Sequence, residues 1–168
     1  PGPNLVEVVA RSSLHQIDSP AAAIQVVCTA AAVSRPRLCI LAIGIDTYSQ
    51  SQLLDLNYAA IDAQDLAAEV RKIASTQFDV YAITLLNEKA TFEGIAHKFK
   101  QISTNLNLTG DDVFLLFLAG HGMTRNEQFY FLSHNFKQFQ GEVVNAVTPE
   151  LVRQWLVDLK AFKTLVLI

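Results

Sequence analysis

A run of largely apolar residues ends at a histidine flanked by glycines. Residues 113–119 form this run, and Gly120-His121-Gly122 follows it directly. A continuous apolar run of this length predicts a buried strand covered on both faces of a parallel sheet. In open α/β sheets, functional residues gather at the carboxyl ends of the strands. His121 is therefore a candidate catalytic side chain, and the alternative is a capped core histidine.

Strands and helices are predicted to alternate along most of the chain. Apolar runs predict strands over residues 38–45, 78–86, 113–119 and 164–168, with a short extended segment at 129–132. Helical periodicity predicts helices over residues 57–74, 91–106 and 148–159. Thr91 and Thr148 are predicted N-caps, and Pro149 suits the first helical position. The alternation indicates βαβ crossovers and a mainly parallel sheet, the α/β class.

The first 36 residues lack this regularity. Residues 5–10 favour a short strand, whereas residues 21–33 fit either a strand or a helix. We interpret residues 1–36 as an N-terminal arm or linker from something upstream, and residues 37–168 as one domain.

Composition narrows the class of protein. The chain of 168 residues is 51% hydrophobic and 17% charged, which indicates a well-filled core rather than disorder. A net charge of −3 without a basic cluster argues against a nucleic-acid binder. No apolar stretch has the length of a membrane span, so no membrane partner and a reduced, cytoplasmic setting are expected. Cys28 and Cys39 are both expected to be buried, inert thiols.

Several chemistries lack their signatures. The sequence contains no G-x-G-x-x-G or phosphate-loop pattern, no metal-ligand spacing of histidines and cysteines, and no G-x-S-x-G elbow. His15 and His97 are expected on the surface, and His134 is expected to be structural or exposed.

Three segments together carry a family resemblance. Residues 37–46 (RLCILAIGID), 56–63 (LNYAAIDA) and 116–122 (LFLAGHG) resemble the large-subunit core of the caspase-like cysteine peptidases, with bacterial metacaspases or orthocaspases as the nearest group. The resemblance covers residues 37–168 and implies a three-layer α/β/α sandwich. It also implies a bacterial protein that hydrolyses peptides or proteins. The buried strand predicted at the end of the given sequence leads us to expect a larger, multidomain protein.

The resemblance assigns roles to two neighbouring residues. His121 becomes the catalytic imidazole that serves a cysteine thiolate as acid and base. Gly122 becomes an oxyanion-hole donor through its backbone N–H. The family's nucleophile follows the next core strand in an Asp-x-Cys setting, and the sequence stops at that strand, after Ile168. This chain alone is therefore expected to be inactive, and a complementary C-terminal part carrying the cysteine is an expected partner.

Two aspartates are candidate substrate-binding residues. Asp62 matches an acidic position of the metacaspase pocket that selects Arg or Lys. The equally weighted alternative is that Asp62 is only an acidic residue in the first turn of a helix, where the helix dipole favours a negative charge. Asp46 lies at another strand end. The resemblance leaves calcium activation open, but no acidic cluster matches it, and no cofactor is expected. A catalytically inactive scaffold or signalling module is the alternative function, and a flavodoxin-like ligand-binding domain is a weaker third.

Overall fold

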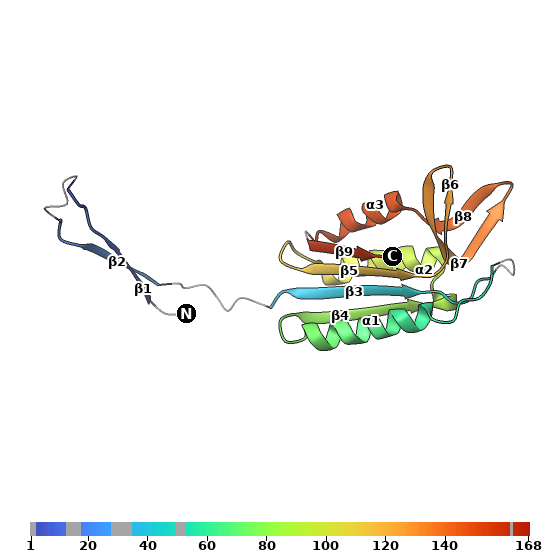
Figure 1. The fold of residues 1–168 in the computed structure, drawn as a ribbon, viewed down its shortest axis with the longest axis horizontal. Helices are drawn as coiled ribbons and strands as arrows, with labels where there is room; N and C mark the ends of the chain where they lie inside the picture. Colours follow the sequence, from blue (N-terminus) through green and yellow to red (C-terminus); the bar gives the residue numbers. More distant parts are fainter. Residues whose placement is uncertain (1–2, 13–17, 28–34, 50–52, 162) are drawn as a thin grey trace. The chain divides into compact units, whose positions relative to one another are not determined.

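The computed structural model describes residues 3–12, 18–27, 35–49, 53–161 and 163–168. The chain divides into two compact units, Pro1–Ser34 and Arg35–Ile168 (Figure 1). No helix in the described ranges is long and apolar enough to cross a membrane.

A two-stranded antiparallel hairpin forms the described part of the first unit. β1 (Pro3–Val8) pairs with β2 (Ala22–Val27). The strand predicted at residues 5–10 is thus present two residues earlier, and residues 22–27 are strand rather than helix. His15 and Cys28 lie outside the described residues, so the expectations for them stay predictions.

A four-stranded parallel sheet forms the centre of the second unit. Its order is β4-β3-β5-β9, with β3 and β5 in the middle (Figure 1). The strands are β3 (Arg37–Gly44), β4 (Asp79–Leu86), β5 (Val113–Ala119) and β9 (Lys163–Leu167). Each lies within a residue or so of its predicted position. β3 is the most completely buried of the described strands, because layers on both faces of the sheet cover it.

Helices cover both faces of this sheet. The helices are α1 (Ala59–Ala74), α2 (Phe92–Leu106) and α3 (Pro149–Leu159), with a short 3-10 helix, η1 (Asn87–Lys89), before α2. On one face, Ala63 and Ala67 of α1 pack against Ile40. On the other face, α2 and α3 bury Phe99 and Leu159 against the sheet. The predicted three-layer α/β/α sandwich is confirmed.

Two helix starts follow the sequence rules closely. The Thr91 hydroxyl accepts a hydrogen bond from the backbone N–H of Gly94 at 3.0 Å. The Thr148 hydroxyl accepts one from Leu151 at 3.3 Å, and Pro149 follows Thr148. Each cap satisfies a backbone donor that the helix leaves free.

A second, antiparallel sheet extends beyond the single short segment that was predicted. Its strands are β6 (Gly122–Arg125), β7 (Gln128–Phe139) and β8 (Glu142–Val147). The β6–β7 turn places Asn126 and Glu127 at positive φ, as two-residue hairpin turns require. Because this turn contains no glycine, the sequence carries little sign of it.

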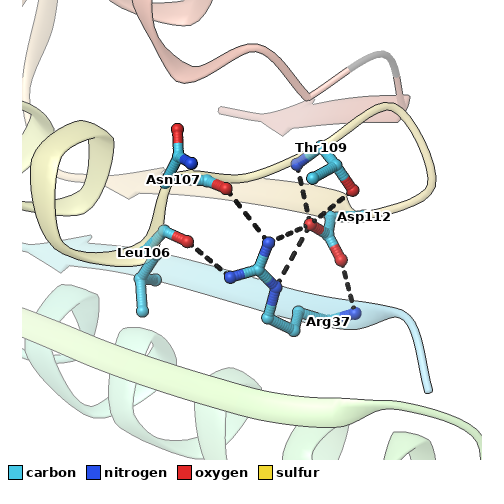
Figure 2. A network of polar contacts seen from close by, with 5 residues as sticks. All are labelled: Arg37, Leu106, Asn107, Thr109 and Asp112. Atoms are coloured by element: carbon cyan, nitrogen blue, oxygen red, sulfur yellow. Dashed lines mark hydrogen bonds and ion pairs between the residues drawn. The ribbon is translucent and has the colours of Figure 1, made fainter. Parts of the chain in front are cut away.

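A partly buried ion pair joins β3 to the loop before β5, at the amino end of the sheet (Figure 2). The carboxylate of Asp112, which is 3% exposed, lies 2.5 Å from the Arg37 guanidinium. It also accepts the backbone N–H of Arg37 at 2.7 Å and that of Thr109 at 2.7 Å. The guanidinium further donates to the carbonyls of Leu106 and Asn107, where α2 ends.

These contacts set the charge state of Asp112. Burial by itself raises the pKa of a carboxyl, but the hydrogen bonds from Arg37 and Thr109 outweigh it and lower the Asp112 pKa well below its usual range. The pair therefore stays ionised and fixes the end of α2 to the start of both central strands.

Candidate active site

His121 lies in the short connection between the two sheets. Gly120 and His121 link the end of β5 to the start of β6, so the histidine lies at the carboxyl end of the parallel sheet. The His121 side chain is half-buried. Its carbonyl accepts the backbone N–H of Leu132 at 2.9 Å, which fixes the connection against β7.

A backbone carbonyl determines the tautomer of the imidazole. Nε2 of His121 lies 2.7 Å from the carbonyl oxygen of Leu54. Since a carbonyl only accepts hydrogen bonds, Nε2 carries the proton in the neutral ring. Nδ1 is then left with its lone pair and is the atom able to take a proton from another group.

Tyr48 contacts the same histidine from a second direction. The backbone N–H of His121 donates to the Tyr48 hydroxyl oxygen at 2.7 Å. The two rings also lie against each other, with centroids 5.1 Å apart and planes at 43°. Burial raises the pKa of Tyr48 to about 12, although the hydrogen bond from His121 works in the opposite direction. The phenol therefore stays protonated at neutral pH.

The segment that carries Tyr48 is itself held in place. The side-chain oxygen of Asn87 accepts the backbone N–H of Asp46 at 2.8 Å. Nδ1 of His134 lies 2.7 Å from the carbonyl of Thr47, and the His134 carbonyl accepts the N–H of Ser49 at 2.9 Å. His134 therefore has a structural role, which is one of the two alternatives that the sequence left open. His97 is exposed on α2, as the sequence predicts.

Of the two candidate aspartates, Asp46 follows β3 and contacts the start of α1, and Asp62 lies in the first turn of α1. Asp46 is half-buried, and its carboxylate accepts the backbone N–H of Ala60 at 3.3 Å. Asp62 is exposed in the first turn of the helix. Within the described ranges, neither carboxylate forms a hydrogen bond or ion pair with His121. The geometry thus gives Asp46 a helix-capping contact, and substrate binding by either residue stays a prediction.

Gly122 is exposed at the first position of β6 and faces Phe131 across the hairpin. A Cβ atom at this position would lie 2.7 Å from the ring of Phe129. A side chain at position 122 would therefore displace the ring of Phe129. Its role as an oxyanion donor stays a prediction.

Cys39 pairs with Phe114 near the start of β5, away from the imidazole that follows the end of that strand, and Cys28 lies outside the described residues. Cys39 is fully buried in β3, and burial raises the pKa of its thiol to about 12, so it is inert as expected. Among the residues that the structure describes, no three His, Cys, Asp or Glu side chains form a metal-binding cluster. The calcium activation that the resemblance leaves open stays a prediction.

Sequence reasoning missed Tyr48 and Leu54. Leu54 contributes a main-chain carbonyl, which no side-chain pattern reveals. Tyr48 gave one usable sign, because it lies just after a predicted strand, at the same edge of the sheet as His121.

Comparison with known proteins agrees with this architecture. The sequence profile of the caspase domain family matches residues 37–161. Among solved structures, the crystal structure of protein GSU0716 from Geobacter sulfurreducens is similar, with a TM-score of 0.55 and 21% sequence identity. The alignment covers 78% of this chain and 48% of that one, so the chain spans about half the length of this structural relative. No curated protein matches. Because the family profile covers most of the chain, the protein belongs to the caspase domain family.

Proposed function

We propose that this domain supplies the histidine half of a caspase-like cysteine endopeptidase. Family membership supports a cysteine peptidase at the level of the family. The observation that carries the proposal for this chain is the contact between Nε2 of His121 and the carbonyl of Leu54 at 2.7 Å. It leaves Nδ1 as a base at the carboxyl end of the sheet, where an attacking group can be placed.

The register of β9 indicates where the nucleophile would lie. β9 runs parallel to β5, with Leu167 opposite Phe117. A residue directly after Ile168 would therefore be level with Ala119, on a strand about 5 Å away. That position is two residues before the level of His121. A cysteine following β9 would thus approach the imidazole, as the resemblance to the family implies.

The proposed chemistry uses two groups of this chain. Nδ1 of His121 takes the proton of the cysteine thiol, and the thiolate attacks the scissile carbonyl carbon. The backbone N–H of Gly122 donates to the oxygen as it becomes negative. The imidazolium then returns the proton to the leaving amine as the peptide C–N bond breaks. Water hydrolyses the acyl-enzyme in the second half of the reaction.

Cleavage after Arg or Lys is the proposed specificity. Asp62 matches the acidic pocket position of metacaspases, and its carboxylate is exposed and free to meet a cation. Leu56 occupies the approximate place of the arginine that selects Asp in animal caspases, so nothing at that position favours an acidic substrate.

A complementary C-terminal part is the proposed partner. β9 is the last strand in the order of its sheet, and its apolar side chains remain open. Leu165 is 50% exposed and Ile168 is 73% exposed. An apolar strand with an open edge favours pairing with a further strand. An upstream domain joined through residues 1–36 is part of the same proposal.

The test uses the full-length protein and a pair of fluorogenic peptides. One peptide has Arg before the reporter and the other has Asp, and each is assayed with and without calcium. We expect cleavage of the Arg peptide only, its loss in His121→Ala, and retention in His97→Ala, an exposed histidine on α2. Cleavage that survives His121→Ala would contradict the proposal. Weaker binding of the Arg peptide in Asp62→Asn would support the pocket role of Asp62.

An inactive scaffold is the second candidate function. The observation that favours it is the burial of Cys39, which leaves no reactive thiol beside His121 among the described residues. The residue that follows β9 in the parent gene separates the two functions. Asp-x-Cys there supports the peptidase, and any other residue at the cysteine position supports the scaffold.

A further inference from the structure

We propose that Tyr48 is a positioning residue for His121, and that its hydroxyl determines how the imidazole meets the Leu54 carbonyl. This inference rests on the proposed peptidase function, in which Nδ1 of His121 acts as the base. It concerns a residue that does not touch the substrate and acts only through the histidine.

The first support is the hydrogen bond to the main chain of the histidine. The Tyr48 hydroxyl oxygen accepts the backbone N–H of His121 at 2.7 Å. This short bond fixes the peptide from which the imidazole projects. The ring of Tyr48 also lies 5.1 Å from the imidazole, centroid to centroid, and limits its rotation.

The second support is the space reserved for the hydroxyl. A Cβ atom at Gly120 would lie 2.8 Å from the Tyr48 hydroxyl oxygen and 3.2 Å from the ring of Phe131. A side chain at position 120 would therefore displace the phenol or the strand end. The absence of a side chain at Gly120 lets the phenol reach the backbone of the next residue.

The third support is that Tyr48 is held independently of His121. The backbone on either side of it is fixed by His134, through the Thr47 carbonyl at 2.7 Å and the Ser49 N–H at 2.9 Å. A phenol on an anchored backbone can determine the position of its partner, whereas a phenol on a free loop would only follow it.

These contacts together form a two-point hold. The Tyr48 hydroxyl oxygen accepts the backbone N–H of His121, and the Leu54 carbonyl accepts a hydrogen bond from Nε2 of its ring. Since both residues lie between the end of β3 and the start of α1, one connection sets both the place and the tautomer of the imidazole. Without the hydroxyl, the His121 N–H loses its acceptor, and the ring is freed to leave the Leu54 carbonyl.

The first measurement is nitrogen NMR of the histidine rings in Tyr48→Phe. This variant keeps the aromatic ring and removes only the hydroxyl. We expect His121 of the unaltered chain to show the Nε2–H tautomer, and its ring shifts in Tyr48→Phe to move toward those of the exposed His97. Tyr81→Phe, on the remote strand β4, is the matched control and should leave His121 unchanged. Unchanged His121 ring shifts in a folded Tyr48→Phe protein would overturn the inference.

The second measurement is kinetic and uses the full-length protein. Tyr48→Phe should lower kcat for the Arg peptide about tenfold and leave KM nearly unchanged, because the hydroxyl acts on the base and not on the substrate. An unchanged kcat would also count against the inference. If Tyr48→Phe changes the His121 ring shifts but the protein shows no His121-dependent cleavage, the proposed peptidase function is wrong. The positioning of His121 by Tyr48 would still be supported.

Discussion

The carbonyl oxygen of Leu54 lies 2.7 Å from Nε2 of His121, although 67 residues separate the two in the chain. The contact is made possible by the parallel order of the sheet. β3 and β5 are neighbours that end at the same edge, so the connection after β3 reaches the residue that follows β5. Among the residues that the structure describes, a backbone carbonyl and not a second ionisable side chain therefore holds the proton of the imidazole.

Truncation of the Leu54 side chain should have almost no effect. The side chain is 84% exposed, and only the main-chain oxygen meets His121. We expect Leu54→Ala to retain the Nε2–H tautomer and to change the free energy of unfolding by less than about 0.5 kcal/mol. Ring nitrogen shifts and urea unfolding check this. A change of tautomer in Leu54→Ala would mean that the side chain, and not the carbonyl, orders the contact.

Loss of the ion pair between Arg37 and the buried Asp112 carboxylate should lower the stability of the fold. In Arg37→Ala the Asp112 carboxylate remains buried with its main charged partner removed, so we expect the free energy of unfolding to fall by about 3 kcal/mol. Lys72→Ala is the matched control, because Lys72 pairs with Glu69 at 3.3 Å on an exposed helix surface. That control should lose less than about 1 kcal/mol. Equal losses in the two variants, measured by urea unfolding, would contradict this account.

The same carboxyl predicts a response to acid. The pKa of Asp112 is lowered in the folded protein from an ordinary value of 3.8, so the folded state favours the ionised form. The stabilisation is present above pH 3.8 and is lost as the pH falls below it, toward the lowered pKa of the folded state. The difference in unfolding free energy between the unaltered chain and Asp112→Asn should therefore narrow between pH 5 and pH 2. If this difference in unfolding free energy stayed constant between pH 5 and pH 2, the lowered pKa of Asp112 would contribute nothing to stability.

The Cys39 thiol should react only when the domain opens. It is fully buried, and burial raises its pKa to about 12, so neither access nor thiolate is available in the folded state. In a Cys28→Ser background, we expect labelling by a thiol reagent at pH 8 to follow the rate of unfolding and to accelerate in urea. Rapid labelling in the absence of urea would contradict the burial of this strand.

The sequence predicted the central sheet well because the physical cause of each strand is local. Apolar runs at β3 and β5 show that both faces are covered, and hydroxyls at Thr91 and Thr148 mark the helix starts. The second sheet was largely missed, since its β6–β7 turn uses Asn126 and Glu127 at positive φ in place of glycine.

The candidate site was predicted only in part, and the reason differs from residue to residue. His121 stands out through its strand and its glycines. Tyr48 and Leu54 act through main-chain atoms brought together by the sheet order, which one-dimensional spacing does not contain. The Asp46 carboxylate accepts the backbone N–H of Ala60, a contact that the sequence did not predict, and its role in substrate binding stays a prediction.

The ion pair in Figure 2 and the histidine lie at opposite ends of the same central strands. Arg37 opens β3 and Asp112 immediately precedes β5, whereas Tyr48 and His121 follow the ends of those strands. Each of these two strands is thus held by the ion pair at its amino end and positions a residue of the candidate site at its carboxyl end. Substitutions in the loops at the carboxyl ends of the strands can change the chemistry of the site without weakening the ion pair. Loss of the ion pair would shift both strands and therefore all of these loops together.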